Sequence, residues 1–212
     1  MNIAAVILAR GGSKEIPKKN IIQINNTPLL EYSIKTALHS EVNQVWVSTD
    51  CPDIKKVAKK SGANVLNRPQ KFSQDYSKSE DALLHFAQNV HFDILVFIQP
   101  TSPLLSSKDI NKGLQMIKNK KYDSVFSAYK EHWLPRWNKD YEPVNWDIYQ
   151  RPMRQEVEDL YVENGAFYIT TYNSLINSKL RYSGKIGILE MPFSRSFQID
   201  TRDDLSIVER ML

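Results

Sequence analysis

The sequence contains a single cysteine, Cys51, and this scarcity excludes several kinds of protein. One thiol can build neither an intrachain disulfide nor a cysteine-based metal site, which agrees with a reducing compartment. The four histidines have no metal-ligand spacing. No apolar run approaches the roughly 20 residues that cross a bilayer, and the short apolar start predicts a strand and not a signal peptide. We therefore expect a cytoplasmic chain with no membrane partner.

The sequence has only a small excess of positive charge. It contains 28 Lys and Arg and 24 Asp and Glu residues, which give a net charge of +4. Without a long basic run, this balance does not predict a nucleic-acid partner. It is compatible with an evenly mixed surface and with a small polyanionic substrate. A length of 212 residues is enough for one α/β core, so we expect a single domain over residues 1–212.

Apolar runs alternate with amphipathic segments over the first two-thirds of the chain. This alternation predicts an α/β protein with a mostly parallel sheet and helices on both faces. Thr27 and Pro28 are expected to start one helix, and a capping box from Ser77 to Glu80 is expected to start another. The expected strands are 3–9, 45–49, 65–66, 94–98, 124–128, 165–170, 186–191 and 197–200, and the expected helices end near 39, 61, 89, 118 and 212.

Residues 129–163 break this pattern. They contain Trp133, Trp137 and Trp146 among three prolines, with poor periodicity. So many aromatic side chains are unusual in a long loop unless something covers them. We expect an excursion from the main sheet that contacts a second copy of the chain, and a plain surface loop is the alternative.

The turn after the first expected strand, residues 9–20, has the composition of an anion-binding loop. It lies at the carboxyl edge of the sheet, where open α/β proteins bind ligands. Gly11 and Gly12 allow phosphate oxygens to approach the backbone. A triphosphate suits this charge, although the spacing matches neither a Walker A loop nor a dinucleotide fingerprint. The four cations of the turn are Arg10, Lys14, Lys18 and Lys19.

Ile7-Leu-Ala-Arg-Gly-Gly-Ser-Lys14, continued to Ile21, resembles the opening motif of the acylneuraminate cytidylyltransferases. The resemblance continues in order along nearly the whole chain. It implies a Rossmann-like nucleotide-sugar transferase fold, a homodimer, and transfer of CMP from CTP to the anomeric hydroxyl of an acidic nine-carbon sugar. The further motifs are Val47–Asp50, Asn67–Pro69, Ile98–Leu104, Glu163–Tyr168 and Ile199–Thr201 with Asp204-Leu205.

The resemblance also implies two sets of binding residues. An arginine fork suits a sugar carboxylate, and the amide of Asn20 suits the edge of cytosine. Arg136 is a weaker candidate for the same carboxylate. The CTP residues are Ala9, Arg10, Gly11, Gly12, Ser13, Lys14, Lys19, Asn20, Arg68 and Ser79. The sugar residues are Gln99, Thr101, Ser102, Arg154 and Tyr168.

By the same resemblance, Arg10, Lys19 and Asp200 are catalytic, and Asp200 holds a Mg²⁺ cofactor. The family often has a second carboxylate two residues before this aspartate, but here the residue is Gln198. An amide can coordinate only weakly and supplies no charge, so Asp50 or Asp75 is an alternative second ligand. The alternative role for Asp200 itself is to cap the last helix.

Three readings of the function stay open at this point. The preferred substrate is a sialic-acid-like nonulosonic acid. Legionaminic acid, deaminated neuraminic acid and an eight-carbon Kdo-type acid are alternatives, and the pseudaminic branch suits the Gln99-Pro-Thr-Ser motif less well. A nucleotide-binding module without catalysis is the alternative from another class.

Overall fold

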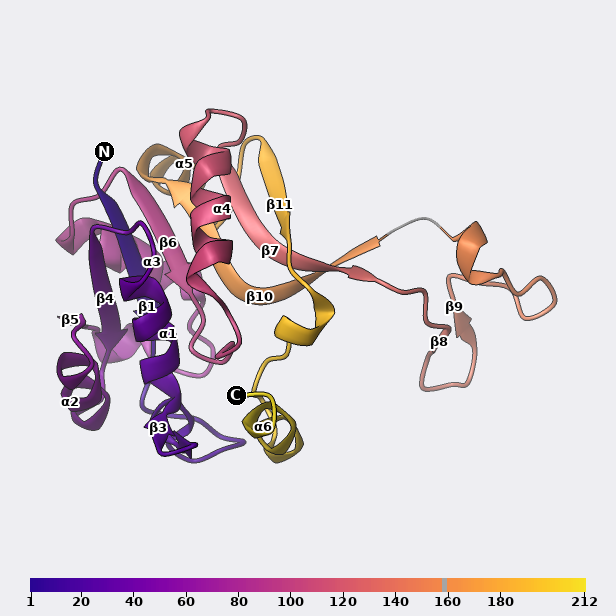
Figure 1. Cartoon of the computed structure of the whole chain (residues 1–212), viewed down its shortest axis with the longest axis horizontal. Coiled ribbons are helices and arrows are strands. Elements are labelled where there is room, and N and C mark those ends of the chain that lie inside the picture. Colours follow the sequence, from indigo (N-terminus) through magenta and orange to yellow (C-terminus); the bar gives the residue numbers. More distant parts are fainter. Residues whose placement is uncertain (158–159) are drawn as a thin grey trace.

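The computed structural model describes residues 1–157 and 160–212, and a seven-stranded sheet forms its centre (Figure 1). The strand order is β11-β7-β10-β6-β1-β4-β5. All neighbours are parallel except at β10, which is antiparallel to both β6 and β7. The expected mixed, mostly parallel sheet is therefore confirmed. The strands are β1 (Ile3–Leu8), β4 (Gln44–Thr49), β5 (Asn64–Asn67), β6 (Ile94–Ile98), β7 (Ser124–Glu131), β10 (Leu160–Thr171) and β11 (Ile186–Glu190).

Helices cover both faces of this sheet, which is why its central strands are apolar on both sides. In Figure 1, α1 and α4 lie in front of the sheet and α3 lies behind it. Alternate residues of β1 divide between the layers: Ala5 and Ile7 join the front core, and Val6 joins the rear core. The front helices are α1 (Leu29–Leu38), α2 (Pro52–Lys60) and α4 (Ser107–Lys118), and the rear helices are α3 (Ser79–Asn89) and α5 (Tyr172–Ser178).

The last helix, α6 (Arg202–Glu209), lies outside these two layers. Its Val208 packs with Ile16 and Ile199 in a third apolar cluster. This cluster joins the turn after β1 to the C-terminal segment. None of the helices in the described parts of the chain is both long enough and apolar enough to cross a membrane.

Two helices start later than the sequence predicts. Thr27 and Pro28 form β3 (Thr27–Pro28), which pairs with β2 (Gln23–Ile24) through a tight turn with positive φ at Asn25 and Asn26. The cap expected at Thr27 is therefore wrong, because this hairpin uses its backbone and α1 begins only at Leu29.

The capping box expected at Ser77 is also wrong, because α3 begins at Ser79 without a side-chain cap. The Ser77 hydroxyl donates to Lys71 O (3.0 Å) and accepts from Gln74 N (3.1 Å). These local hydrogen bonds use the Ser77 hydroxyl, which therefore does not cap the start of α3.

Residues 197–200 do not form the expected strand. They follow a short 3-10 helix, η4 (Phe193–Arg195), and lead directly into α6. Ile199 N donates to Thr101 O (2.8 Å), and no strand ladder is formed there. Helix α5 lies outside the helices that the sequence predicts, and Thr171 caps it by accepting from Ser174 N (3.2 Å).

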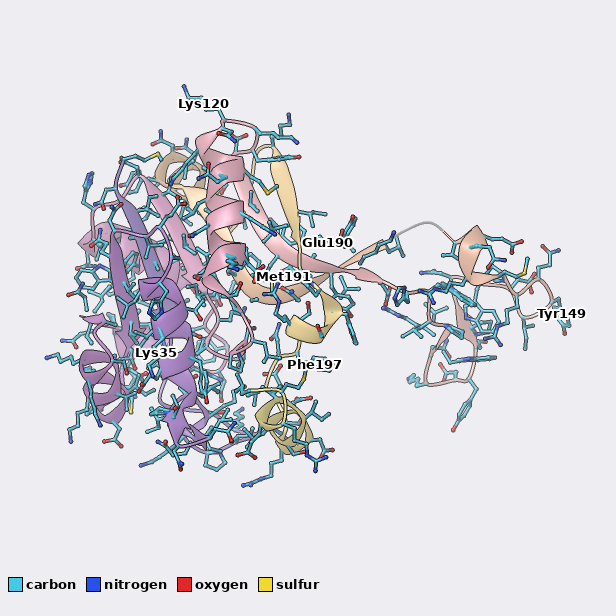
Figure 2. The ribbon with its side chains drawn as sticks, viewed as in Figure 1. Lys35, Lys120, Tyr149, Glu190, Met191 and Phe197 are labelled. Carbon is cyan, nitrogen blue, oxygen red and sulfur yellow. The ribbon has the colours of Figure 1, made fainter. Side chains whose placement is uncertain are left out.

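β7 and β10 continue beyond the sheet as a two-stranded ribbon that carries an arm (Figure 1). Trp146 packs edge-on against Trp133 and Trp137, with ring centroids 6.3 and 5.1 Å apart. Figure 2 shows Tyr149 at the far end of the arm, away from Met191 in the body. The described arm runs over residues 132–157, between β7 and β10, and residues 158–159 of the expected excursion lie outside the described residues. Its contact with a second chain stays a prediction. The arm's described elements are β8 (Arg136–Trp137), β9 (Pro143–Val144) and the 3-10 helix η3 (Arg154–Glu156).

Candidate active site

The turn after β1 is held in place by one hydrogen bond to the segment after β4 and one within the turn itself. Gly11 N donates to Asp50 Oδ1 (3.0 Å) at the end of β4. Asn20 Nδ2 donates to Arg10 O (2.9 Å), which closes the turn on itself. Asn20 is buried, and this bond uses one N–H of its amide, which leaves the second N–H and the oxygen for the expected contact with cytosine.

The two glycines of the turn have different reasons to be glycine. A Cβ at Gly11 would lie 2.9 Å from Cys51 Cβ, so the close approach of the segment between β4 and α2 excludes a side chain there. A Cβ at Gly12 would meet no atom within 4 Å. The backbone at Gly12 therefore faces open space in which a ligand can lie.

A cleft of about 280 Å³ opens beside this turn, at the carboxyl ends of the parallel strands β1 and β6. Its third wall is the segment between β5 and α3. Strand ends that lie far apart in the sequence meet here because parallel neighbours end at the same edge. Seven residues that the sequence predicts line the cleft: Arg10, Lys19, Asn20, Arg68, Ser79, Gln99 and Thr101.

Arg68 gives the clearest sign that the cleft binds a ligand. It is only 7% exposed, and its Nε and Nη2 have no hydrogen-bond partner among the described residues. Burial is the main cause that lowers the pKa of Arg68 to about 10. The charge of Asp50 raises this pKa, and the charge of Arg10 lowers it by a smaller amount. The guanidinium is thus charged at neutral pH. A buried cation without acceptors is costly, and an anionic or polar ligand in the cleft would supply them.

Two cations of the turn face one carboxylate across the cleft. Asp75 bonds to Arg10 Nη1 (2.8 Å) and to Lys14 Nζ (2.7 Å). The bond from Lys14 holds the pKa of Asp75 below its usual range, because together with Arg10 it outweighs the effect of burial. Phosphate groups of a nucleotide would compete with Asp75 for both cations.

Lys19 joins the turn to the C-terminal segment. Its Nζ donates to Ile199 O (3.1 Å) and to Asp200 Oδ1 (2.9 Å). The N-cap of α6 is Thr201, in a capping box with Asp204, so the alternative role of Asp200 as that cap is wrong. Asp200 is thus not used as a helix cap, and its carboxylate lies beside Lys19, a cation that lines the cleft.

The amide nitrogen of Gln198 is engaged by the protein backbone, since its Nε2 donates to Asn164 O. Asp50 holds Gly11 N, and Asp75 is paired with the cations. Within residues 1–157 and 160–212, no three His, Cys, Asp or Glu side chains gather as a metal site. One carboxylate, Asp200, supplemented by nucleotide phosphates and water, is a donor set that Mg²⁺ accepts.

The Gln99–Ser102 motif forms the opposite wall of the cleft. Gln99 N donates to Ala166 O (3.1 Å), which fixes the backbone at the end of β6. The hydroxyl oxygens of Thr101 and Ser102 are buried and have no partner in the described part of the chain. Gln99 and Thr101 line the cleft, whereas Ser102 lies behind it, 2% exposed.

Two predicted sugar residues lie away from the cleft within one chain. Tyr168 is 3% exposed and stacks on Phe97, with ring centroids 5.4 Å apart. Burial, followed by the hydrogen bond to Glu163, raises its pKa. Phe97 lines the cleft, and Tyr168 lies beside it as its pairing partner on the neighbouring strand β10. Arg154 lies on the arm, where it contacts His132.

The weaker candidate, Arg136, is on the arm too, in an ion pair with Glu131. Sequence reasoning missed most of the wall between β5 and α3. The only sequence signal for this wall was that its residues lie between two predicted CTP residues, Arg68 and Ser79. The missed lining residues of this wall are Phe72, Gln74, Ser77 and Lys78.

A Rossmann-like sheet with a cationic cleft at its carboxyl edge defines an α/β nucleotide-binding protein. The structure of a CMP:2-keto-3-deoxy-manno-octonic acid synthetase complexed with CTP has the same fold, with a TM-score of 0.76 at 20% identity over 100% of this chain and 98% of that chain. Residues 4–211 match the family model described as cytidylyltransferase. The chain therefore belongs to the cytidylyltransferase family.

Curated relatives agree with this assignment. N-acylneuraminate cytidylyltransferase B of Danio rerio is 39% identical over 215 residues, which cover 98% of this chain and 50% of that protein. Post-translational flagellin modification protein B of Campylobacter coli is 30% identical over 99% of this chain and 94% of its own length. The chain thus spans about half the length of the Danio rerio protein that it matches.

Proposed function

We propose that this chain transfers CMP from CTP to the anomeric hydroxyl of a sialic-acid-like nonulosonic acid and releases pyrophosphate. The observation that carries the proposal is the buried, unpartnered guanidinium of Arg68 in a cleft that it shares with Arg10 and Lys19. These cations suit a nucleoside triphosphate, and Gln99 with the unpaired hydroxyl of Thr101 suits a polyhydroxylated acid. Family membership supports the cytidylyl group.

The choice of acid rests on the relatives. The Danio rerio relative is named for an N-acylneuraminate and is 39% identical over nearly the whole of this chain. A Campylobacter jejuni relative named pseudaminic acid cytidylyltransferase is 28% identical. We therefore place the N-acylneuraminate type first and keep other ulosonic acids as alternatives in the assay. A cytoplasmic location, where CTP is available, stays a prediction.

In the proposed reaction, the anomeric oxygen of the acid attacks the α-phosphorus of CTP. The bond from this phosphorus to the bridging oxygen of the β-phosphate breaks, and pyrophosphate leaves. Arg10 and Lys19 bind phosphate oxygens and spread the developing negative charge. The proton of the attacking hydroxyl passes to the carboxylate of Asp200, which Lys19 releases when it binds phosphate.

We propose Mg²⁺ as the cofactor, held by Asp200 and by phosphate oxygens of CTP. When bound, it would withdraw negative charge from the phosphates. The exposed side-chain fraction of Asp200 is 64%, so this carboxylate is open to such a ligand. Lys19 would then pass from Asp200 to a phosphate oxygen while keeping its bond to Ile199 O.

We also propose that the arm forms a homodimer contact. Its exposed apolar side chains are too numerous for a surface in water, since such patches usually mark interfaces. In a dimer, Arg154 of the arm would lie near the partner's cleft, which would agree with its predicted sugar contact. The measurement is light scattering of the wild type and of Trp137→Ala with Tyr149→Ala. The exposed residues are Leu134, Trp137, Tyr141, Val144, Ile148, Tyr149 and Met153.

The test of the activity is a pyrophosphate assay with purified chain, CTP, Mg²⁺ and a panel of ulosonic acids, with the CMP-sugar identified by mass. We expect the highest kcat/KM with an N-acylneuraminate. Asp200→Ala should abolish turnover and retain CTP binding in calorimetry, which separates an enzyme from a nucleotide-binding module. If no acid gives pyrophosphate above background, the proposed function is wrong.

A further inference from the structure

The antiparallel strand β10 has an irregularity at the sugar end of the cleft. Its register with β7 shifts between Glu163 and Tyr168. Gly165 in this bulge has φ +66°, which a residue with a side chain rarely adopts. A Cβ at Gly165 would overlap the amide nitrogen of Gln198 and lie 3.1 Å from Gln99 Oε1. The bulge therefore brings its backbone against two side-chain amides.

A buried polar network fixes the residue before this glycine. Asn164 is 3% exposed. Its Oδ1 accepts from Ser127 Oγ (2.6 Å) and from Ala166 N (3.2 Å), and its Nδ2 donates to Ser196 Oγ (2.9 Å). The side chain of Asn164 is thus fully used inside the bulge. Its backbone carbonyl needs a donor from elsewhere.

Gln198 supplies this donor, because its Nε2 donates to Asn164 O. An amide can fill this role, and a carboxylate cannot, since ionised oxygens only accept. The segment is fixed on both sides of Gln198. Arg195 forms a two-bond pair with Asp109, and Ile199 N donates to Thr101 O (2.8 Å). Gln198 is therefore held at the bulge and turned toward the protein backbone.

We propose that Gln198 is a positioning residue for the sugar end of the cleft, which keeps the Asn164–Gly165 bulge against Gln99, and that it is not a metal ligand. This inference rests on the proposed function, since Gln99 is taken there as a sugar contact. It explains why a neutral amide occupies this position: the neighbouring carbonyl requires an N–H donor. The CTP-side residues Arg10 and Arg68 lie in the loops after β1 and β5, so this contact does not hold them.

The test is Gln198→Glu, which keeps the shape of the side chain and replaces the donor with a charged acceptor facing Asn164 O. Loss of this bond should raise the KM for the sugar about tenfold or more. The KM for CTP and the Mg²⁺ concentration for half-maximal rate should stay within about twofold. Gln88→Glu is the matched control. Gln88 is exposed on α3, so this substitution introduces the same charge away from the cleft.

A second readout does not depend on activity. Hydrogen exchange of the β10 segment 160–171 should be faster in Gln198→Glu than in the wild type, and unchanged in Gln88→Glu. CTP binding measured by calorimetry without metal should be unchanged. Gln198→Ala removes the donor without adding charge, and it should shift the sugar KM and the exchange rate in the same direction. It serves as the test if Gln198→Glu does not fold.

Two results would overturn the inference. One is an unchanged sugar KM with unchanged exchange in both Gln198 variants. The other is a lower Mg²⁺ requirement and a faster rate in Gln198→Glu, which would make this position a metal ligand. If the wild type itself makes no pyrophosphate, the proposed function has failed, whereas an active wild type with unaltered Gln198 variants contradicts the role of Gln198 alone.

Discussion

The ion pair between Asp109 and Arg195 connects the start of α4 to the segment that carries Asp200. Removing the charge of Asp109 should therefore lower the unfolding free energy of the chain. The side chain of Asp109 is 5% exposed and that of Arg195 is 32% exposed. The carboxylate also accepts from Ser106 N (3.1 Å) and Ser106 Oγ (2.8 Å) at the N-terminus of α4. The perturbation we consider is Asp109→Asn, which keeps the shape and removes the charge.

The expected loss follows from the burial of the two partners. Removal of one partner of a fully buried ion pair costs about 3–5 kcal/mol. Here Arg195 can regain water because a third of its side chain is exposed, so we expect about 2–3 kcal/mol of unfolding free energy. For a chain of this length, such a loss lowers Tm by roughly 5–10 °C.

The pH dependence of this loss has a definite sign. Burial raises the pKa of Asp109, but the hydrogen bonds from Arg195 and Ser106 outweigh it, so the pKa lies below its usual range. A lowered folded-state pKa contributes stability above the unfolded value, about 3.9, and this stability is lost as pH falls through the folded value. The difference in unfolding free energy between the wild type and Asp109→Asn should thus be constant from about pH 5 to 7, which lies above the unfolded-state pKa of ~3.9. This difference should shrink below about pH 4.

The assay is urea unfolding of both proteins over this pH range, with kcat measured in parallel. The matched control is Asp53→Asn, because Asp53 pairs with Lys18 at 3.3 Å on the surface. That pair should contribute less than about 1 kcal/mol. A loss for Asp109→Asn no larger than that of the control, or one that grows at acidic pH, would refute the reasoning.

Three further changes probe the cleft and the bulge. Asp75→Asn should lower the KM for CTP by about two- to fivefold in initial-rate measurements, because it releases Arg10 and Lys14; a higher KM would instead make Asp75 part of the nucleotide site. Arg68→Met should raise the calorimetric Kd for CTP at least about tenfold without loss of stability, since it removes an unpaired buried charge, and an unchanged Kd would contradict the site. Gly165→Ala should cost about 1–3 kcal/mol in urea unfolding because of its positive φ, and wild-type stability would contradict that strain.

The sequence alone determined the elements whose signal is local. The apolar runs over 3–9 and 94–98 predict buried strands because burial on both faces leaves no polar position. The cationic turn follows from neighbouring residues in the chain, whereas the choice of Asp200 came from the family resemblance and not from a local pattern. The sequence prediction was wrong where one side chain could take part in two local structures. Ser77 was expected to cap a helix, but its hydroxyl donates to Lys71 O in the preceding turn.

Only the tertiary structure decided which of these side chains meet and which are left without partners. Lys19 bonds to Asp200, 181 residues further along the chain, and Gln198 bonds to Asn164. The unpaired state of Arg68 is a property of everything around it, so no local pattern can show it. Such contacts depend on how the whole chain folds, because only the folded sheet and its loops bring segments that are far apart in the sequence together at the cleft.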